Sequence, residues 1–300
     1  MNAFHHIRKN MLIAATVIAL MTSITGDARA QDKGDLHYLA IGVSTVPGMP
    51  QHMQLRFAHK DALDLARAWQ SQQGPLYGNV RGETLTNEKA KLADIVAGLD
   101  RLEANAKAGD TVVVSFAGHG GVLGMRSSQW MFVPYDYNPY NATQTGLYEW
   151  QVREQLTRLT KRGATVILIV DTCHAAAFAS ADSGIVIFAA CSVFEESLED
   201  SNFQNGLFSR AMIEAMQGRG DSNQDGIITL AEIDSYVTTR LREMHASNPS
   251  FDENGRRRLQ QPVHIRPTSV ERDRPLAGAS NPSQQPTAGP DRMRAKAGGN

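Results

Sequence analysis

Two side chains with catalytic chemistry follow apolar segments of this 300-residue sequence. His119 comes after TVVVSFA, which begins at Thr111, and Cys173 comes after TVILIVD, which begins at Thr165. Both segments are rich in β-branched residues and have the length of buried parallel strands, so both side chains are expected at the carboxyl edge of one sheet. Open α/β sheets place their active sites at that edge. The sequence therefore predicts an imidazole beside a thiol, the pair needed for nucleophilic acyl transfer.

The residue types around this pair suit thiol catalysis. A free thiol, with a pKa of about 8.5, is mostly protonated at neutral pH, so a neighbouring imidazole has to take its proton. Cys173 is thus the expected nucleophile, and His119 the expected base and then acid. The backbone N–H groups of Gly120 and Cys173 are the expected oxyanion donors, because glycine lets the backbone approach a substrate carbonyl closely. The structural alternative is a small core thiol and a turn histidine, but their matched positions at strand ends favour catalysis.

Further motifs extend this pattern and resemble the caspase and metacaspase group of cysteine peptidases, over residues 37–263. That group has one strand ending in Gly-His-Gly and a later strand ending in Asp-x-Cys-His-Ser-Gly; the corresponding strings here are FAGHGG and VDTCHA. Other matching strings are LAIGVS, KDALDLARAW, FVPYD, AACSVFEESLE and NGLFSRAMIEAM. The resemblance implies that His119 and Cys173 form the catalytic dyad. Ala175 and Ala176 replace the Ser-Gly of the pattern, which leaves open a non-catalytic binding module of the same fold.

The same resemblance implies a basic residue at P1, the substrate residue whose carbonyl is attacked. Asp171 lies two residues before Cys173, as in metacaspases, which cleave after arginine or lysine; animal caspases, which cleave after aspartate, have glutamine there. Asp61 in FAHKDA matches a second acidic position of the metacaspase pocket. Carboxylates at the base of the pocket would pair with a cationic P1 side chain and repel an acidic one. Alternatively, Asp61 is an exposed carboxylate on the surface of a helix, and Asp171 only caps the end of its strand.

A separate motif predicts a calcium site. DSNQDGIITLAE, residues 221–232, fits the EF-hand loop D-x-[DN]-x-[DN]-G-x₅-E and has helical patterns on both sides. In this loop Gly226 makes the turn, and the expected ligands are Asp221, Asn223, Asp225, the carbonyl of Ile227, Thr229 and Glu232. The alternative is a polar turn without metal. Calcium would regulate the protein or only stiffen this hairpin, so the chain could also be chiefly a calcium-responsive scaffold; no cofactor is expected to be required for catalysis.

The elements around these motifs alternate between strands and helices. The strings predict strands at 37–46, 111–117, 130–134, 165–171 and 184–191, and helices at 56–72, 88–107 and 148–161, with Thr86 or Asn87 capping the second helix. This alternation predicts an α/β fold, and the resemblance makes it a caspase-like three-layer α/β/α sandwich with a mainly parallel sheet. The expected domain covers residues 31–270. From residue 271 onward, Pro, Gly, Ser, Ala and Gln accumulate, which predicts a disordered tail to residue 300.

The composition of the sequence and the absence of certain motifs from it argue against several functional classes. With 42% hydrophobic residues, a chain of this length can bury a full core, and 30 basic against 31 acidic residues give no footprint for nucleic acid. Two cysteines without a CxxC or HExxH motif argue against zinc. The P-loop and GxSxG motifs are also missing from the sequence. The expected partners are therefore peptide or protein substrates.

The first thirty residues have the pattern of a signal peptide. A basic start is followed by an uncharged apolar stretch, Met11 to Ile24, and by the small-x-small sequence Ala28-Arg29-Ala30. We expect cleavage before Gln31, a periplasmic or secreted protein, and no stable membrane insertion afterwards. A retained anchor is the weaker alternative, because the stretch falls short of the ~20 residues that span a bilayer. In an oxidising compartment Cys173 could pair with Cys191, although such a bridge would silence the nucleophile.

Overall fold

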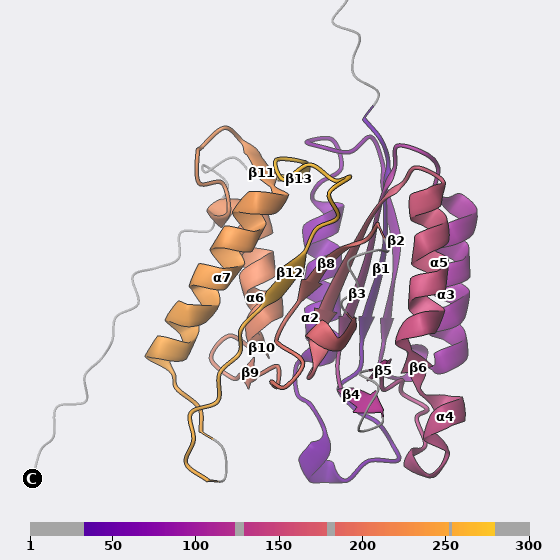
Figure 1. The fold of residues 1–300 in the computed structure, drawn as a ribbon, viewed down its shortest axis with the longest axis vertical. Helices are drawn as coiled ribbons and strands as arrows, with labels where there is room; N and C mark the ends of the chain where they lie inside the picture. The colour runs from indigo at the N-terminus through magenta and orange to yellow at the C-terminus, as the bar shows by residue number, and fades with distance from the viewer. Residues whose placement is uncertain (1–32, 124–128, 179–183, 252–253, 280–300) are drawn as a thin grey trace, which may run out of the picture. The chain divides into compact units, whose positions relative to one another are not determined.

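A six-stranded sheet with the strand order β12-β8-β7-β3-β1-β2 forms the centre of the fold (Figure 1). Five strands are parallel, and β12 at one edge runs antiparallel to β8. The strands are β1 (Leu36–Gly42), β2 (Val80–Thr86), β3 (Thr111–Ala117), β7 (Thr165–Asp171), β8 (Val186–Ala189) and β12 (Val263–Ile265). The expected mainly parallel sheet is confirmed, and β3 and β7 are the two strands predicted to precede His119 and Cys173.

The computed structural model describes residues 33–123, 129–178, 184–251 and 254–279. The expected signal peptide, residues 1–30, and residues 280–300 of the expected tail lie outside this range. None of the helices within it is long and apolar enough to cross a membrane.

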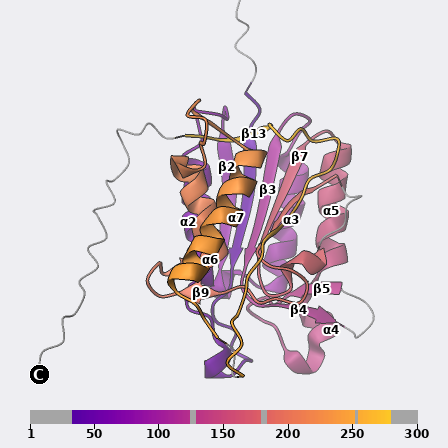
Figure 2. The ribbon, with the colours of Figure 1, turned by 60° about the vertical axis from the view of Figure 1, so that its left-hand side comes forward.

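Helices cover both faces of the sheet (Figures 1 and 2). One face carries α2 (Ala58–Gln70), α6 (Leu207–Glu214) and α7 (Leu230–Ser247); the other carries α3 (Leu92–Asn105) and α5 (Glu149–Lys161). Helix α2 buries Ala62, Leu65 and Trp69, which recur at the three- to four-residue spacing of one helix face. The three-layer α/β/α architecture is therefore confirmed, with the core between the sheet and its two helical layers.

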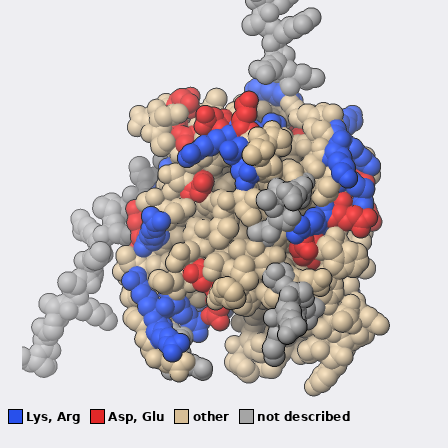
Figure 3. Space-filling model, viewed as in Figure 1, with Lys and Arg blue, Asp and Glu red and all other residues tan. Residues whose placement is uncertain are grey.

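Shorter strands and helices lie at the two ends of the sheet. Near its carboxyl edge lie a three-stranded sheet of β4 (Gly120–Leu123), β5 (Gln129–Phe132) and β6 (Leu147–Tyr148), the helix α4 (Ala142–Thr145), and the pair β9 (Glu199–Asp200) with β10 (Asn205–Gly206) (Figure 1). At the opposite end, β11 (Ile227–Thr229) pairs with β13 (Pro275–Gly278). On the face shown in Figure 3, small groups of basic and acidic side chains alternate, as the near-balanced charge leads one to expect.

Two local expectations need correction. Residues 80–86 form the edge strand β2, which was not expected, because only Val80 and Leu85 are apolar there and Leu85 alone is buried. The expected cap of the second helix at Thr86 or Asn87 is wrong, because α3 begins only at Leu92. The amide oxygen of Asn87 instead accepts a hydrogen bond from the Ser44 N–H at 2.9 Å, and so holds the loop after β1.

The fold also continues beyond residue 270, where the tail was expected to begin. Strand β13 buries Leu276 and Ala277, and the hydroxyl of Tyr77 donates to the carbonyl of Leu276 at 3.0 Å. The sequence did not predict this strand, because apolar side chains at only two positions give no periodic pattern. The burial of these two side chains and the pairing of β13 with β11 hold the segment in place. The ordered part of the domain therefore reaches Ala279.

Candidate active site

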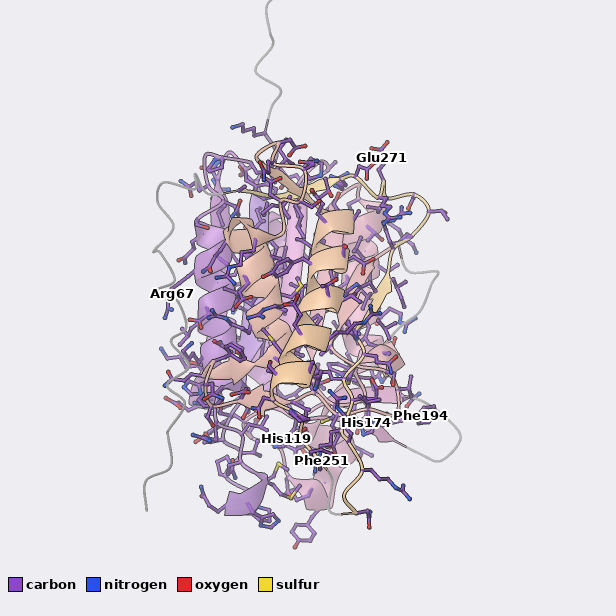
Figure 4. The ribbon with its side chains drawn as sticks, turned by 90° about the vertical axis from the view of Figure 1, so that its left-hand side faces the viewer. Arg67, His119, His174, Phe194, Phe251 and Glu271 are labelled. Carbon is purple, nitrogen blue, oxygen red and sulfur yellow. The ribbon has the colours of Figure 1, made fainter. Side chains whose placement is uncertain are left out.

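The register of the sheet places His119 and Cys173 at equivalent positions. Ala117, the last residue of β3, is paired with Asp171, the last residue of β7. Each of the two catalytic candidates follows two residues later, so both leave the sheet at the same edge. A cavity of about 630 Å³ is lined by both side chains. Figure 4 shows His119 at the same end of the fold as His174, the residue directly after Cys173.

The loop after β3, which carries His119, and the loop after β7, which carries Cys173, are in close backbone contact, and this contact fixes the distance between them. A Cβ at Gly120 would lie 2.5 Å from the Thr172 hydroxyl oxygen and 2.8 Å from the Cys173 carbonyl oxygen, so only glycine fits there. The Thr172 hydroxyl accepts a hydrogen bond from the indole N–H of Trp130 at 3.0 Å and donates to the Cys173 carbonyl at 3.1 Å. Because Trp130 is fully buried, this chain of bonds anchors the nucleophile loop to the core.

A backbone carbonyl orients the imidazole. The Nε2 atom of His119 lies 2.6 Å from the carbonyl oxygen of Met53. A carbonyl can only accept, so Nε2 carries the proton and Nδ1 is left as the nitrogen that can take a proton from a thiol. The side chain of Gln54 holds this loop through bonds with the backbone of Val46 and Met49, between 2.7 and 2.9 Å long. Sequence reasoning missed this contact, because a backbone carbonyl leaves no side-chain signature.

The Cys173 thiol is set up to be protonated before substrate binds. Burial raises its pKa above the ordinary value, and the neighbouring carboxylates of Glu196 and Asp171 act in the same direction. The Ser197 N–H and the Arg258 guanidinium lower the pKa and only partly offset this effect. A mostly protonated thiol needs a base during attack, which is the role that the position of His119 allows.

Asp61 and Asp171, the two expected pocket carboxylates, lie in the same cavity and are both buried. The alternative of an exposed helix carboxylate for Asp61 is therefore wrong. Burial, and then the negative charge of Asp171, raise the pKa of Asp61 well above its usual range. Burial also raises the pKa of Asp171. Gly206 separates them, since a Cβ there would lie 2.7 Å from the Asp171 carboxylate and 3.1 Å from that of Asp61.

The hydrogen-bond partners of these carboxylates are all neutral. Asp171 accepts from the hydroxyl of Ser197 and from Ser209, through its N–H at 3.0 Å and its hydroxyl at 2.6 Å. Asp61 accepts from the Asn205 amide at 2.7 Å and from the Gly206 N–H at 3.0 Å. Uncharged donors orient the two carboxylates, and among the described residues neither of them is bonded to a cationic side chain.

A third carboxylate, which the sequence did not single out, lines the same cavity. Glu199 accepts hydrogen bonds from the backbone N–H groups of Arg56 and Phe57, at 2.9 and 2.8 Å, just before α2 begins. Its negative charge raises the pKa of both Asp61 and Asp171. Glu199 belongs to the motif AACSVFEESLE, but nothing in that string distinguishes it from its acidic neighbours. At the rim of the cavity, Arg258 pairs with Glu196 at 2.7 Å.

The expected calcium loop forms a closed polar turn between α6 and α7. Asp221 accepts from the N–H groups of Asp225 and Gly226, Asn223 and Asp225 accept from N–H groups two residues later, and Gly226 has a φ of 84°. Glu232, the expected closing ligand, is bonded within the same loop: it caps α7 through Thr229 and accepts from Ser222. Among the residues that the structure describes, no group of three His, Cys, Asp or Glu side chains is arranged to hold a metal. The oxygen donors suit calcium, but Glu232 would have to leave these partners to bind it.

Solved structures with the same fold include two that cover most of this chain. A protein from Geobacter sulfurreducens aligns over 82% of this chain and 100% of its own, with a TM-score of 0.56 and 14% identity. Caspase-1 from Spodoptera frugiperda aligns over 83% of this chain and 94% of its own, with a TM-score of 0.57 and 12% identity. A search of curated proteins finds no match. The family profile named Caspase domain matches residues 37–267, most of the chain, and the chain therefore belongs to the caspase-domain family of cysteine peptidases.

Proposed function

We propose that this protein is a cysteine endopeptidase that cleaves peptide bonds after arginine or lysine. The observation that carries this proposal is the cavity that contains His119 and Cys173 and, beside them, the buried carboxylates Asp61 and Asp171 and the half-buried carboxylate Glu199. A thiol and an imidazole at one strand edge are suited to acyl transfer. An acidic pocket beside them selects a cationic side chain, because bringing an acidic one into it would oppose like charges.

The geometry supports the following sequence of steps. The Cys173 sulfur attacks the P1 carbonyl carbon while His119 Nδ1 takes the thiol proton, and the Gly120 and Cys173 N–H groups stabilise the oxyanion. The C–N bond then breaks, and the imidazolium gives its proton to the departing amine, which leaves a thioester on Cys173. His119 next removes a proton from water, which attacks the thioester; the C–S bond breaks, the acid is released, and the imidazolium returns its proton to the Cys173 sulfur. The Met53 carbonyl keeps Nε2 protonated throughout.

A panel of peptides that differ only at P1 tests this proposal on the purified protein. We expect Arg and Lys peptides to be cleaved at least about a hundredfold faster, in kcat/KM, than Asp, Gln or Leu peptides, since charge pairing in a desolvated pocket separates substrates by several kcal/mol. Equal cleavage after Asp would refute the basic preference. Failure of a peptidyl electrophile to label Cys173, together with no turnover, would instead support the binding module that the Ala175-Ala176 change left open.

Calcium binding at residues 221–232 is a second, separate proposal. It is favoured by the turn itself, in which Asp221, Asn223 and Asp225 gather around a glycine with positive φ. The metal would be held by these three side chains, the Ile227 carbonyl, Thr229 and Glu232. Bound calcium would act on stability, because the loop is joined to the rest of the fold through β11 and β13.

Calcium should therefore raise the melting temperature of the wild-type protein, and this rise should disappear in Asp221→Ala/Glu232→Ala. Glu232 also caps α7, so the double variant should melt lower even without calcium, and only the calcium-dependent difference is diagnostic. Glu243→Ala removes an exposed carboxylate of the same helix outside the loop and should keep the full rise. A rise that persists in the double variant would place the metal elsewhere.

We also propose that the protein is exported and acts in the periplasm or outside the cell. The support is the small-x-small sequence Ala28-Arg29-Ala30, which follows the apolar stretch. This sequence ends a few residues before β1, the first strand of the domain, begins at Leu36. The substrates would then be proteins of that compartment that expose arginine or lysine residues.

A further inference from the structure

We infer that the protein binds a small divalent oxyanion, such as sulfate or hydrogen phosphate, in a pocket between α7, β8 and β12. This pocket has a volume of about 210 Å³ and shares no wall residue with the catalytic cavity. In the view of Figure 1, β12 runs between the other two elements. Apolar residues of the three elements form most of the wall. Its titratable and charged side chains are Asp234, His264, Arg266 and Arg272.

Two arginines supply positive charge to this pocket. Arg266 and Arg272 are exposed, and neither forms an ion pair with a carboxylate among the residues that the structure describes. The guanidinium of Arg266 donates to the Pro267 carbonyl at 3.3 Å, which does not neutralise its charge. The carbonyl of Arg272 accepts from the Ala231 N–H at 3.1 Å, so this residue is held against the first turn of α7. Guanidinium groups bind sulfate and phosphate through several N–H donors at once.

His264 lies deeper in the wall than the two arginines. Its side chain is only 10% exposed, and its ring packs edge-on against Phe188, with centroids 4.9 Å apart. The Nδ1 atom is bonded to the carboxylate of Asp234. The Nε2 atom is buried and has no hydrogen-bond partner among the described residues. Buried polar atoms are nearly always hydrogen-bonded, so an unpartnered ring nitrogen in a pocket wall points to a ligand.

The charges of the wall decide the kind of ligand. The hydrogen bond from His264 lowers the pKa of Asp234 more than burial raises it, and the charge of Arg272 also lowers it, so this carboxyl group is ionised at neutral pH. With Nδ1–H directed at Asp234, Nε2 is an acceptor in the neutral ring and a donor in the imidazolium. Two arginines oppose a cation at this nitrogen, whereas an oxyanion fits the imidazolium. The three positive groups and the one carboxylate then leave two positive charges, which match a divalent anion.

The size and the place of the pocket narrow the inference further. Its volume is below the roughly 300 Å³ at which pockets for drug-sized ligands begin, so a small ion is the ligand that fits. Val186 in its wall is paired with Ile167, near the start of β7, whereas Cys173 follows the end of that strand. A bound ion would therefore connect α7 with β12 away from the nucleophile, and its binding can be tested without any peptidase activity.

Calorimetric titration of the full-length protein with sodium sulfate, against a sodium chloride background of constant ionic strength, tests this site. We expect saturable binding of one sulfate per chain. Arg266→Gln and Arg272→Gln should each weaken the Kd by about tenfold or more, the scale of one charge-assisted hydrogen bond. Both side chains are exposed, so the variants should fold as the wild type does. Binding is measured directly because sulfate also stabilises folded proteins through exclusion from their surface.

The matched control is Arg242→Gln, which removes the same charge from an exposed position of α7 outside the pocket. It should bind sulfate as tightly as the wild type. The inference is overturned if the wild type shows no saturable binding, if the two pocket variants bind as tightly as the wild type, or if Arg242→Gln weakens binding as much as they do. The last result would mean that only the net charge matters.

The pH dependence of sulfate binding tests the role of His264. Sulfate remains a dianion between about pH 6 and about pH 8, where an ordinary histidine titrates, so a change in its Kd over this range comes from the protein. The charged groups that line the pocket with this ring are Asp234 from α7, Arg266 beside β12 and Arg272 ahead of β13. Because an anion favours the imidazolium, binding should weaken severalfold as the pH rises, and His264→Gln should abolish this change. A wild-type Kd that does not vary with pH would exclude His264 from the site.

Discussion

Cys173→Ala and His119→Ala should each lower kcat/KM on Arg peptides by several orders of magnitude, because a nucleophile and its base act as a unit and the loss of either removes nearly the whole effect. The double variant should be little worse than either single one. Both variants should melt within a few degrees of wild type, since each side chain is partly exposed in the cavity. Steady-state kinetics with fluorogenic peptides, together with thermal melts, give both quantities.

Cys191→Ser is the matched control for the nucleophile. Cys191 is fully buried, burial raises its pKa to about 12, and it does not line the catalytic cavity. A serine keeps the hydrogen-bond donor to the Thr172 carbonyl, which the thiol reaches at 3.3 Å. Activity should be retained in this variant. Substantial residual activity in Cys173→Ala, or its loss in Cys191→Ser alone, would mean that the nucleophile is wrongly assigned.

Asp171→Asn should affect selectivity while leaving the nucleophile in place. We expect kcat/KM for Arg and Lys peptides to fall by roughly one to three orders of magnitude, or about 1.4 to 4 kcal/mol, and neutral P1 peptides to lose much less. Asp61→Asn should act in the same direction. Asp64→Asn is the control, because Asp64 lies one turn further along α2, also accepts from Asn205, and does not line the cavity.

The pH dependence gives an independent measure of the same pocket. Burial raises the pKa of Asp61 and Asp171, so a falling pH protonates them earlier than ordinary carboxyl groups. The ratio of kcat/KM for Arg over neutral P1 peptides should thus rise with pH as the two groups ionise, and taking this ratio cancels any shared dependence on His119. In the Asp61→Asn/Asp171→Asn double variant the ratio should be low and flat. A ratio independent of pH in the wild type would contradict a role for buried carboxylates.

That His119 and Cys173 lie at the same edge of the sheet was predictable, because the signals are strong and local. Two runs of seven residues rich in β-branched side chains determine strands β3 and β7 and the edge at which they end. Asp171 and Asp61 were identified only through a family pattern. Their convergence depends on the packing of α2 against the sheet and on the Asn205-Gly206 segment that separates them, and neither is visible in sequence spacing.

The elements that the sequence did not predict are those held by partners distant in the chain. Strand β2 has two apolar residues and owes its conformation to seven paired positions with β1. Strand β13 is fixed by β11 and by Tyr77. The Met53 carbonyl reaches His119 because Gln54 folds its loop. In each case long-range contacts override weak local preference, and a pattern of side-chain types cannot report such contacts.

The bond between Tyr77 and Leu276 joins residues 199 positions apart and determines when this protein can finish folding. A chain growing from its amino end can pair β1, β2 and β3 early, yet Tyr77 and Ile228 gain their partners Leu276 and Ala277 only after residue 277 is available. Forming contacts of such long separation is slow, because the intervening chain must be ordered first. This end of the sheet therefore stays incompletely packed until residue 277 has been made, so its closure is expected to be a late step of folding.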